Sequence, residues 1–331
     1  MNNFKNLKNT FFIAEIGNNH EGYYKNAIKL IDQAKKCGAD AVKFQTFNTN
    51  YFINRLEKKR FNRLKSFELT NKEFKKLSIY SKKKGLKFIS TPLDIDSAKF
   101  LSKIVDVFKI SSGDNNFYEL IKFCASFKKP LIISTGMLNF SEIKNILQML
   151  NKIKFPKNKL AFLHCVSDYP VKDDEANLLS IKYLKDKLPV TIGYSDHVIG
   201  SESCLIAAVL GAKIIEKHFT LNNNFSDFRD HQISLNPKNM KQMISSVRRV
   251  ESMLGKYYKN ISRNEKKNQA SMRRSIYFDK KLKKETVLQR KHLKIVRPYK
   301  IIKPNNLSKI LGKKLKKDVQ DSELVSFKIL K

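Results

Sequence analysis

The sequence predicts an α/β fold, a (β/α)8 TIM barrel followed by a small β-rich domain. Eight short strand-like runs recur between residues 11 and 219, and helix-like patterns fill the intervals between them. Alternating strands and helices favour a parallel sheet, and eight such units favour a closed barrel. Polar residues also gather where the runs end, which is the end of a barrel that carries the active site.

The runs follow one another in order as Phe11–Gly17, Ala41–Phe47, Leu86–Pro92, Val107–Gly113, Pro130–Gly136, Leu160–Val166, Val190–Asp196 and Ala212–Phe219. The first interval shows the apolar spacing of a helix in Ala27-Ile28-Leu30-Ile31-Ala34. The βα pattern ends after a helix-like segment over Pro237–Leu254. We therefore assign residues 1–255 to the barrel.

A polar, basic stretch over residues 256–268 has no clear periodicity and is interpreted as a linker. Residues 269–331 then contain short β-type segments between Lys-rich turns, namely Ser275–Phe278, Thr286–Leu288, Leu293–Val296 and Leu324–Phe327. A module of this size cannot build a large core. We expect it to lean on a partner surface.

The formal net charge of +36 raises the possibility of a nucleic-acid partner. Half of this excess lies in residues 256–331, which hold 24 Lys or Arg and 6 Asp or Glu, without zinc-finger spacing or an aromatic RNA-binding motif. A positive field would equally attract a small anionic substrate. We therefore expect no nucleic-acid partner.

Location is indicated only by what the chain lacks. No apolar run reaches the roughly 18 residues of a membrane span, and the N-terminus lacks a secretory apolar region. The four cysteines are dispersed without CxxC spacing and are expected to be reduced thiols. These features predict no membrane association and a cytoplasmic protein.

Two histidines end neighbouring runs. Ser195 and His197 lie two residues apart, as do Glu216 and His218, so each pair shares one face of its strand. If the last two runs are adjacent, both imidazoles can bind one divalent ion such as Mn²⁺, Fe²⁺, Co²⁺ or Zn²⁺. The alternative is that each is a core histidine with satisfied hydrogen bonds.

Lys43 and Lys109 stand within apolar strands, where an unpaired charge is costly. They can bind a phosphate or carboxylate, form a Schiff base, or form structural ion pairs. Hydroxyl groups nearby favour the anion site: Ser111, Ser112, Ser134, Thr135, Ser167 and Ser195. Glu15 and Glu216 are likewise out of place in apolar strands and are candidates for proton transfer or for pairing with lysine. No nucleotide-binding fingerprint is present.

The chain resembles the sialic acid synthase family along nearly its whole length. The matching segments are Ala14–His20, Ala41–Gln45, Ser90–Pro92, Phe108–Asp114, Ser134–Met137, Leu163–Cys165, Tyr169–Pro170, Ser195–His197 and Glu216–Phe219. The stretch from Arg274 to Lys314 resembles that family's antifreeze-like (SAF) module.

The resemblance implies condensation of phosphoenolpyruvate (PEP) with an N-acylated amino sugar, such as N-acetylmannosamine or a di-N-acetylated trideoxyhexose of the legionaminic or pseudaminic type. It implies Mn²⁺ on His197 and His218, with Glu15 and Glu216 near the reacting carbons. PEP-binding positions are matched by Lys43, Thr91, Lys109, Ser112, Ser134, Ser167 and Ser195. Sugar-side positions are matched by Gln45, Tyr169, Asp230 and, from the SAF module of a domain-swapped homodimer partner, Arg297.

Several positions depart from the family pattern, mostly on the sugar side. Arg229 replaces the more usual residue before Asp230, and Asp114 stands where many relatives have Glu. The reaction type therefore transfers better than the identity of the sugar, and a phosphorylated acceptor stays open. Two functions of other classes remain as alternatives, a non-catalytic sugar-binding relative and a basic nucleic-acid-binding protein.

Overall fold

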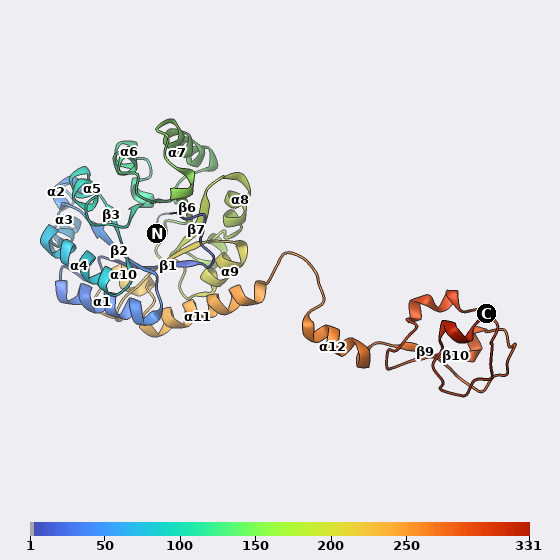
Figure 1. Cartoon of the computed structure of the whole chain (residues 1–331). Coiled ribbons are helices and arrows are strands. Elements are labelled where there is room, and N and C mark those ends of the chain that lie inside the picture. The colour runs from blue at the N-terminus through green and yellow to red at the C-terminus, as the bar shows by residue number, and fades with distance from the viewer. Residues whose placement is uncertain (1–2) are drawn as a thin grey trace. The chain divides into compact units, whose positions relative to one another are not determined.

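The computed structural model describes residues 3–331 and divides the chain into two compact units. The first comprises residues 1–255 and the second residues 256–331 (Figure 1). Each unit has its own buried apolar cluster.

The first unit is a closed barrel of eight parallel strands in sequence order, with helices around it (Figure 1). This confirms the predicted TIM barrel. The strands are β1 (Phe11–Gly17), β2 (Ala41–Thr46), β3 (Lys87–Pro92), β4 (Val107–Ile110), β5 (Leu131–Ser134), β6 (Leu160–Cys165), β7 (Thr191–Asp196) and β8 (Ile214–His218).

The fourth strand is shorter than the run predicted for it. β4 ends at Ile110, and residues 112–114 form a 3₁₀ turn instead of continuing to Gly113. Ser111 donates its hydroxyl hydrogen bond to the Asp114 carboxylate across this turn. Such a local side-chain bond stabilises a turn against further strand pairing.

The helices of the barrel unit are α1 (Tyr24–Cys37), α2 (Thr49–Phe52), α3 (Lys58–Phe67), α4 (Asn71–Lys83), α5 (Ile95–Leu101), α6 (Tyr118–Ser126), α7 (Phe140–Lys152), α8 (Leu179–Lys187), α9 (Glu202–Leu210), α10 (Arg229–Ile233) and α11 (Pro237–Leu254). Local chemistry marks their ends: Gly38 closes α1 in the left-handed conformation, and Asn236 caps α11 just before Pro237. No helix among residues 3–331 combines the length and apolar character that crossing a membrane requires.

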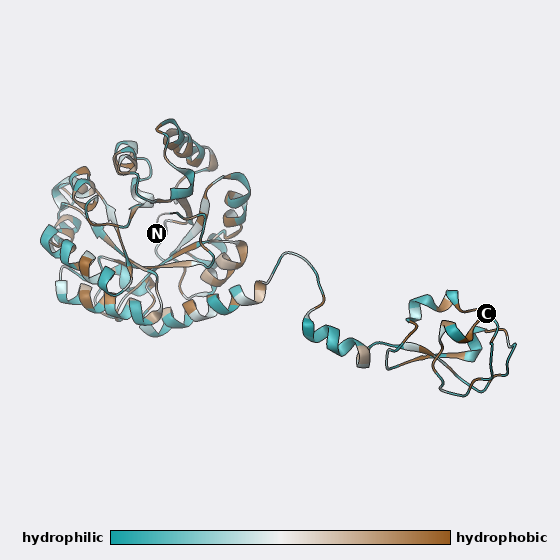
Figure 2. Cartoon of the chain, in the orientation of Figure 1, coloured by the Kyte–Doolittle hydropathy of each residue, from teal (hydrophilic) through white to brown (hydrophobic). Residues whose placement is uncertain are grey.

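Apolar side chains pack in two layers of the barrel. The larger cluster fills the space between the strands and most of the helices, with buried apolar residues from α1, α4, α5, α6, α7, α8, α9 and α11 (Figure 2). A smaller cluster containing Phe4, Phe11, Ile89 and Ile214 fills the barrel interior near the starts of the strands. Polar side chains are thus left for the opposite end of the interior, where the strands finish.

The second unit contains α12 (Arg263–Met272) and a two-stranded antiparallel sheet of β9 (Ser275–Phe278) and β10 (Leu293–Val296). Only these two of the four predicted β segments are strands, because Val287 and Leu324 each form only an isolated bridge. The predicted linker is also partly helical, since α12 begins at Arg263 and runs past residue 268. Ile276, Phe278 and Val325 belong to the small core.

Candidate active site

A cavity of about 1320 Å³ opens where the barrel strands end. It brings together most of the site residues predicted from the sequence: Glu15, Lys43, Gln45, Lys109, Ser112, Ser134, Ser167, Tyr169, Ser195, His197, Glu216, His218 and Asp230. Thr91 lies beneath this lining, buried, with its hydroxyl 3.4 Å from Lys43 Nζ. Arg297 is exposed in the second unit, so the barrel structure does not test its assignment.

Strand pairing explains why residues so distant in sequence meet. In β1, Glu15 pairs with Lys43 of β2 on one side and with His218 of β8 on the other. In the same way Ser195 of β7 pairs with Glu216 of β8. The closed barrel therefore brings these side chains together at its mouth.

Four buried charges form a network at the floor of the cavity. Lys43 Nζ lies 2.9 Å from Glu15 Oε2 and 3.6 Å from Glu216 Oε1, and Lys109 Nζ lies 3.8 Å from Glu216 Oε1. Lys109 also donates to Ser134 Oγ at 2.7 Å, and Ser195 donates to Glu216 Oε1 at 2.9 Å. Each charged side chain has an opposite partner, which offsets part of the free-energy cost of burying it.

The two carboxyl groups differ in their protonation. Burial raises the pKa of Glu15 to about 7, with Lys43 opposing the shift. Burial also favours the neutral form of Glu216, but attraction to Lys109 and Lys43 outweighs it and holds the pKa of Glu216 below its usual range. Neighbouring carboxyl groups separated in this way can take different roles, one exchanging a proton and the other remaining charged.

The lysines also differ. Burial alone would lower the pKa of Lys43, but Glu15 and Glu216 outweigh it, so the pKa of Lys43 is raised. Burial lowers the pKa of Lys109. A Schiff-base lysine needs a depressed pKa, which argues against that role for Lys43.

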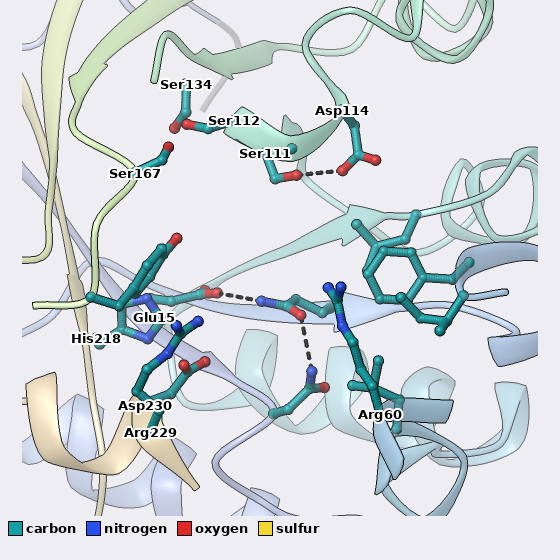
Figure 3. A pocket seen from close by; sticks show the side chains of 18 of the residues that line it. Glu15, Arg60, Ser111, Ser112, Asp114, Ser134, Ser167, His218, Arg229 and Asp230 are labelled. Atoms are coloured by element: carbon teal, nitrogen blue, oxygen red, sulfur yellow. Dashed lines mark hydrogen bonds between the residues drawn. The ribbon is translucent and has the colours of Figure 1, made fainter. Parts of the chain in front are cut away.

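Hydroxyl groups form a small polar cradle beside this network (Figure 3). Ser112 Oγ accepts a hydrogen bond from Gly136 N–H at 3.2 Å, and Ser167 Oγ is buried without a partner among the described residues. A Cβ atom at residue 136 would collide with both hydroxyl oxygens. A glycine at position 136 therefore leaves room for these hydroxyl groups. They lie close to the ammonium group of Lys109, which donates a hydrogen bond to Ser134.

The geometry of His197 and His218 suits a divalent metal ion. Their ring centroids lie 5.4 Å apart, and His197 donates from Nδ1 to Val166 O at 2.8 Å, which leaves its Nε2 lone pair free. His218 Nδ1 is buried without a hydrogen-bond partner among the described residues. No group of three His, Cys, Asp or Glu side chains within residues 3–331 is arranged to hold an ion. The pair thus fits an ion that takes its other ligands from substrate or water.

A second polar group lies on the side of the cavity formed by β1, β2 and α10. Asn18 donates to Gln45 Oε1 at 3.0 Å, and Gln45 Nε2 lies 3.4 Å from Glu15 Oε1. The Arg229 guanidinium stacks 4.6 Å from the centre of the Tyr169 ring. This wall offers amide, phenol and guanidinium groups of the kind that bind sugar hydroxyl and acyl groups.

One supporting pair was missed at the sequence level because its side chains point away from the cavity. Asp196 forms a 2.7 Å ion pair with Lys217, and both side chains are buried. Asp196 also accepts hydrogen bonds from Tyr194 and Ser203. The pair joins β7 to β8 one residue before each candidate metal ligand, and the only sequence signal was a charge in each apolar strand.

The positions of His164 and Arg60 relative to the cavity could be assigned only from the structure. His164 faces away from the main cavity, with Nε2 2.9 Å from Ala176 O and its ring stacked on Tyr194. Arg60 of α3 lines the cavity with its neighbours Lys58 and Lys59, yet the sequence shows only a basic stretch there.

Comparisons with known proteins agree with this site. Residues 30–259 match the model of the NeuB family. The chain is 36% identical over 333 residues to the N,N'-diacetyllegionaminic acid synthase of Campylobacter jejuni, covering 96% of this chain and 99% of that protein. It is 30% identical over 330 residues to the human N-acetylneuraminate-9-phosphate synthase, covering 95% and 91%.

A solved structure is similar as well. The N-acetylneuraminic acid (sialic acid) synthetase of Leptospira borgpetersenii superposes with a TM-score of 0.75 at 35% identity, covering 79% of this chain and 90% of that one. The match extends from the barrel fold to the sequence of nearly the entire chain. The chain therefore belongs to the NeuB family, the family of the sialic acid synthases.

Proposed function

We propose that this protein is a nonulosonic (sialic-type) acid synthase that condenses PEP with an N-acylated amino sugar and releases phosphate. One observation carries the proposal: the buried network of Lys43, Lys109, Glu15 and Glu216 lies beside the hydroxyl cradle in one cavity. The names of the legionaminic and neuraminate synthases among the relatives support it. The acceptor is N-acetylmannosamine, a derivative of it, or a di-N-acetylated trideoxyhexose.

PEP would lie over the two lysines. Its phosphate and carboxylate match the ammonium groups of Lys43 and Lys109 and the hydroxyl groups of Ser112, Ser134, Ser167 and Ser195, with Thr91 supporting Lys43 from below. Small hydroxyl donors can surround an anion without crowding it. Lys43 and Lys109 form ion pairs with Glu15 and Glu216 in the structure. A bound anion would therefore compete with these carboxylates for the lysine ammonium groups.

The reaction then needs an electrophile and two proton transfers. PEP C3 forms a bond to the aldehyde carbon of the open-chain sugar, water adds to C2, and the C2–O bond breaks as phosphate leaves. Glu15, with its pKa raised to about 7, is assigned the proton transfer, and the ionised Glu216 is assigned the positioning of water. Gln45, Tyr169 and Asp230 would orient the sugar.

His197 and His218 would hold a divalent ion, for which Mn²⁺ is our first candidate. When bound, the ion supplies Lewis acidity that polarises the aldehyde oxygen. The protein's part is to present two imidazoles at a fixed separation. The hydrogen bond from His197 Nδ1 to Val166 O fixes the orientation of that ring, and burial lowers the pKa of His218 and so favours its neutral form.

The second unit is assigned the role of an SAF module in a domain-swapped homodimer. Arg297 is exposed at the end of β10 and is available to a neighbouring molecule. In the proposed dimer, Arg297 of the partner subunit contacts the sugar.

The deciding experiment is phosphate release from PEP with Mn²⁺ across a panel of N-acetylated hexoses and trideoxyhexoses, with and without a chelator. Release that requires a sugar and is lost on chelation supports both the synthase and its metal. Release that persists in chelator removes the metal assignment. PEP binding without release for any acceptor contradicts the proposed reaction and favours a non-catalytic sugar-binding relative.

A further inference from the structure

Asp196 and Lys217 form the last registered residue pair between β7 and β8. Lys217 Nζ lies 2.7 Å from Asp196 Oδ2, and the side chains of Lys217 and Asp196 are 1% and 0% exposed. His197 and His218 follow these residues directly. Because side chains alternate along a strand, the ion pair lies on the helix side of the sheet while both imidazoles line the cavity. The two candidate metal ligands therefore stand just beyond the point where this ion pair joins the strands.

The ammonium group of Lys217 contacts the end of β7 on both sides of His197. It donates one hydrogen bond to the carboxylate of Asp196, which precedes the histidine, and another to Val198 O, which follows it. The Asp196 carboxylate in turn accepts a hydrogen bond from Val198 N–H at 2.9 Å. Residues 196 and 198 are thus bound to each other and to β8. These contacts fix the backbone from which the His197 side chain projects.

Further donors from β7 and α9 hold the Asp196 carboxylate in place. Tyr194 donates its hydroxyl hydrogen bond to Oδ1 at 2.9 Å. Ser203 Oγ donates to Oδ2 at 2.7 Å, and Cys204 Sγ donates to the same oxygen at 3.2 Å. An ion pair buried in a core is often no more stabilising than apolar residues of similar volume, because both charges lose their hydration. Stability alone is therefore a weak reason for placing this pair behind the cavity.

The two imidazole rings have few hydrogen bonds of their own. His197 Nδ1 donates to Val166 O at 2.8 Å, whereas His218 Nδ1 is buried without a partner among residues 3–331. The backbone of His197 also accepts a hydrogen bond from Val171 N–H at 3.1 Å, but this contact does not connect it to β8. The 5.4 Å separation of the two ring centroids therefore depends on how the ends of β7 and β8 are held together.

We propose that Asp196 and Lys217 are positioning residues for the histidine pair. Their buried ion pair, which contacts the backbone on both sides of His197, fixes the separation and orientation of His197 and His218 and thereby their affinity for a divalent ion. This inference rests on the proposed function and adds the residues that organise its metal site. Both side chains point away from the cavity, so they act through the backbone of the two histidines. Replacement of such supporting residues typically weakens metal binding about 10–100-fold.

The first test is calorimetric titration of the metal-free, full-length protein with Mn²⁺. Asp196→Asn and Lys217→Met should each raise the Kd ~10-fold or more, but each also leaves a buried charge without its partner. The double variant Asp196→Asn/Lys217→Met removes both charges, so we expect it to regain stability in urea unfolding without regaining affinity for Mn²⁺. Affinity that returns together with stability would overturn the positioning role. Tyr194→Phe/Ser203→Ala keeps both charges and loses only two hydrogen bonds to Asp196, so it provides a milder variant, with an expected rise in Kd of ~3-fold.

Asp40→Asn is the matched control, because Asp40 directly precedes β2 at the opposite end of the barrel. Like Asp196, Asp40 accepts a backbone hydrogen bond, from Phe12 N–H at 2.8 Å, and lies beside a cation, Arg248, at 3.3 Å. This control should lower the free energy of unfolding and leave the Kd for Mn²⁺ unchanged. An equal rise in Kd in the control would show that metal affinity follows general stability, which would overturn the inference.

Nuclear magnetic resonance of the metal-free protein tests the inference without metal or turnover. With ¹⁵N-labelled histidine, the Nδ1–H of His197 should give a slowly exchanging resonance, because it is buried and bonded to Val166 O, and His197→Gln assigns it. In the double variant Asp196→Asn/Lys217→Met we expect this proton to exchange ~10-fold faster or more. An unchanged resonance in the folded double variant would overturn the inference. If the unaltered protein binds no Mn²⁺, the metal assignment of the proposed function fails, while this resonance still decides whether the ion pair positions His197.

Discussion

Charged side chains are arranged differently in the barrel cavity and in residues 256–331. At the cavity floor, Lys43 and Lys109 are 4% and 2% exposed, and both lie against carboxylates. In the second unit, Lys283 pairs with Asp318 at 3.0 Å, but the lysine side chain is 87% exposed. The two kinds of pair are similar in distance and differ in burial.

This difference shows which charges carry information about function. Removal of one member of a buried pair leaves an uncompensated charge that costs several kcal/mol, whereas an exposed pair contributes little. A charged side chain buried in the barrel is therefore expected to have a structural or a catalytic role. The exposed basic residues of the second unit cost little free energy, so their excess does not by itself indicate a partner.

The largest expected effect comes from removing a floor lysine. In Lys43→Met, Glu15 and Glu216 lose their nearest cation, so we expect at least ~1000-fold lower phosphate release and about 3–5 kcal/mol lower stability. Lys283→Met is the matched control at an exposed pair and should change neither quantity measurably. Enzyme assays and urea unfolding of both variants provide the comparison. Similar losses in the two variants would show that burial does not separate the Lys43 pair from the Lys283 pair in importance.

Breaking the buried Asp196–Lys217 ion pair between β7 and β8 should give the next largest effect. Asp196→Asn leaves Lys217 buried without its counter-charge, so we expect a loss of about 3 kcal/mol in urea unfolding. The double variant Asp196→Asn/Lys217→Met should recover part of this loss, because no buried charge then remains. A double variant less stable than the single one would indicate that hydrogen bonds, such as that from Ser203, dominate instead.

A smaller effect is expected from the one charge of the second unit to which we assign a function. Arg297→Ala should raise the KM for the sugar about 10-fold, with little change in the KM for PEP. Arg290→Ala, an arginine of the same unit at the start of a 3₁₀ turn, is the control. Equal changes in both KM values would remove the assignment of Arg297 to the sugar.

The smallest effect concerns pH. Burial lowers the pKa of His20 to about 3, so the unfolded chain binds a proton first as pH falls below the usual histidine pKa of about 6.5. The contribution of neutral His20 is therefore complete above this pH and is lost as pH falls towards 3. Between pH 6 and pH 5 the resulting decrease in the free energy of unfolding is about 1 kcal/mol. In His20→Asn this part of the slope should disappear from urea unfolding measured at several pH values, and an unchanged slope would contradict the assignment.

Much of the barrel could be predicted because its signals are local. The run Phe11–Gly17 and the helix Pro237–Leu254 have the predicted bounds, since apolar composition, Gly17, Asn236 and Pro237 mark them within the sequence. The fourth run was predicted too long because the bond between Ser111 and Asp114 was not foreseen. In the second unit, the predicted β-type segments at Val287 and Leu324 form only isolated bridges, because their pairing depends on distant partners.

The sequence by itself determined the alternation of strands and helices and the residue types at the strand ends, because period and composition are properties of neighbouring residues. Only the tertiary structure decided which of these residues meet. Closure of β1 onto β8 places Glu15 beside His218, some two hundred residues away. It also decided that Lys43 and Lys109 pair with carboxylates whereas Arg60 and Arg229 form no salt bridge among residues 3–331. Such pairing depends on burial and on distances between elements that the sequence does not relate to one another.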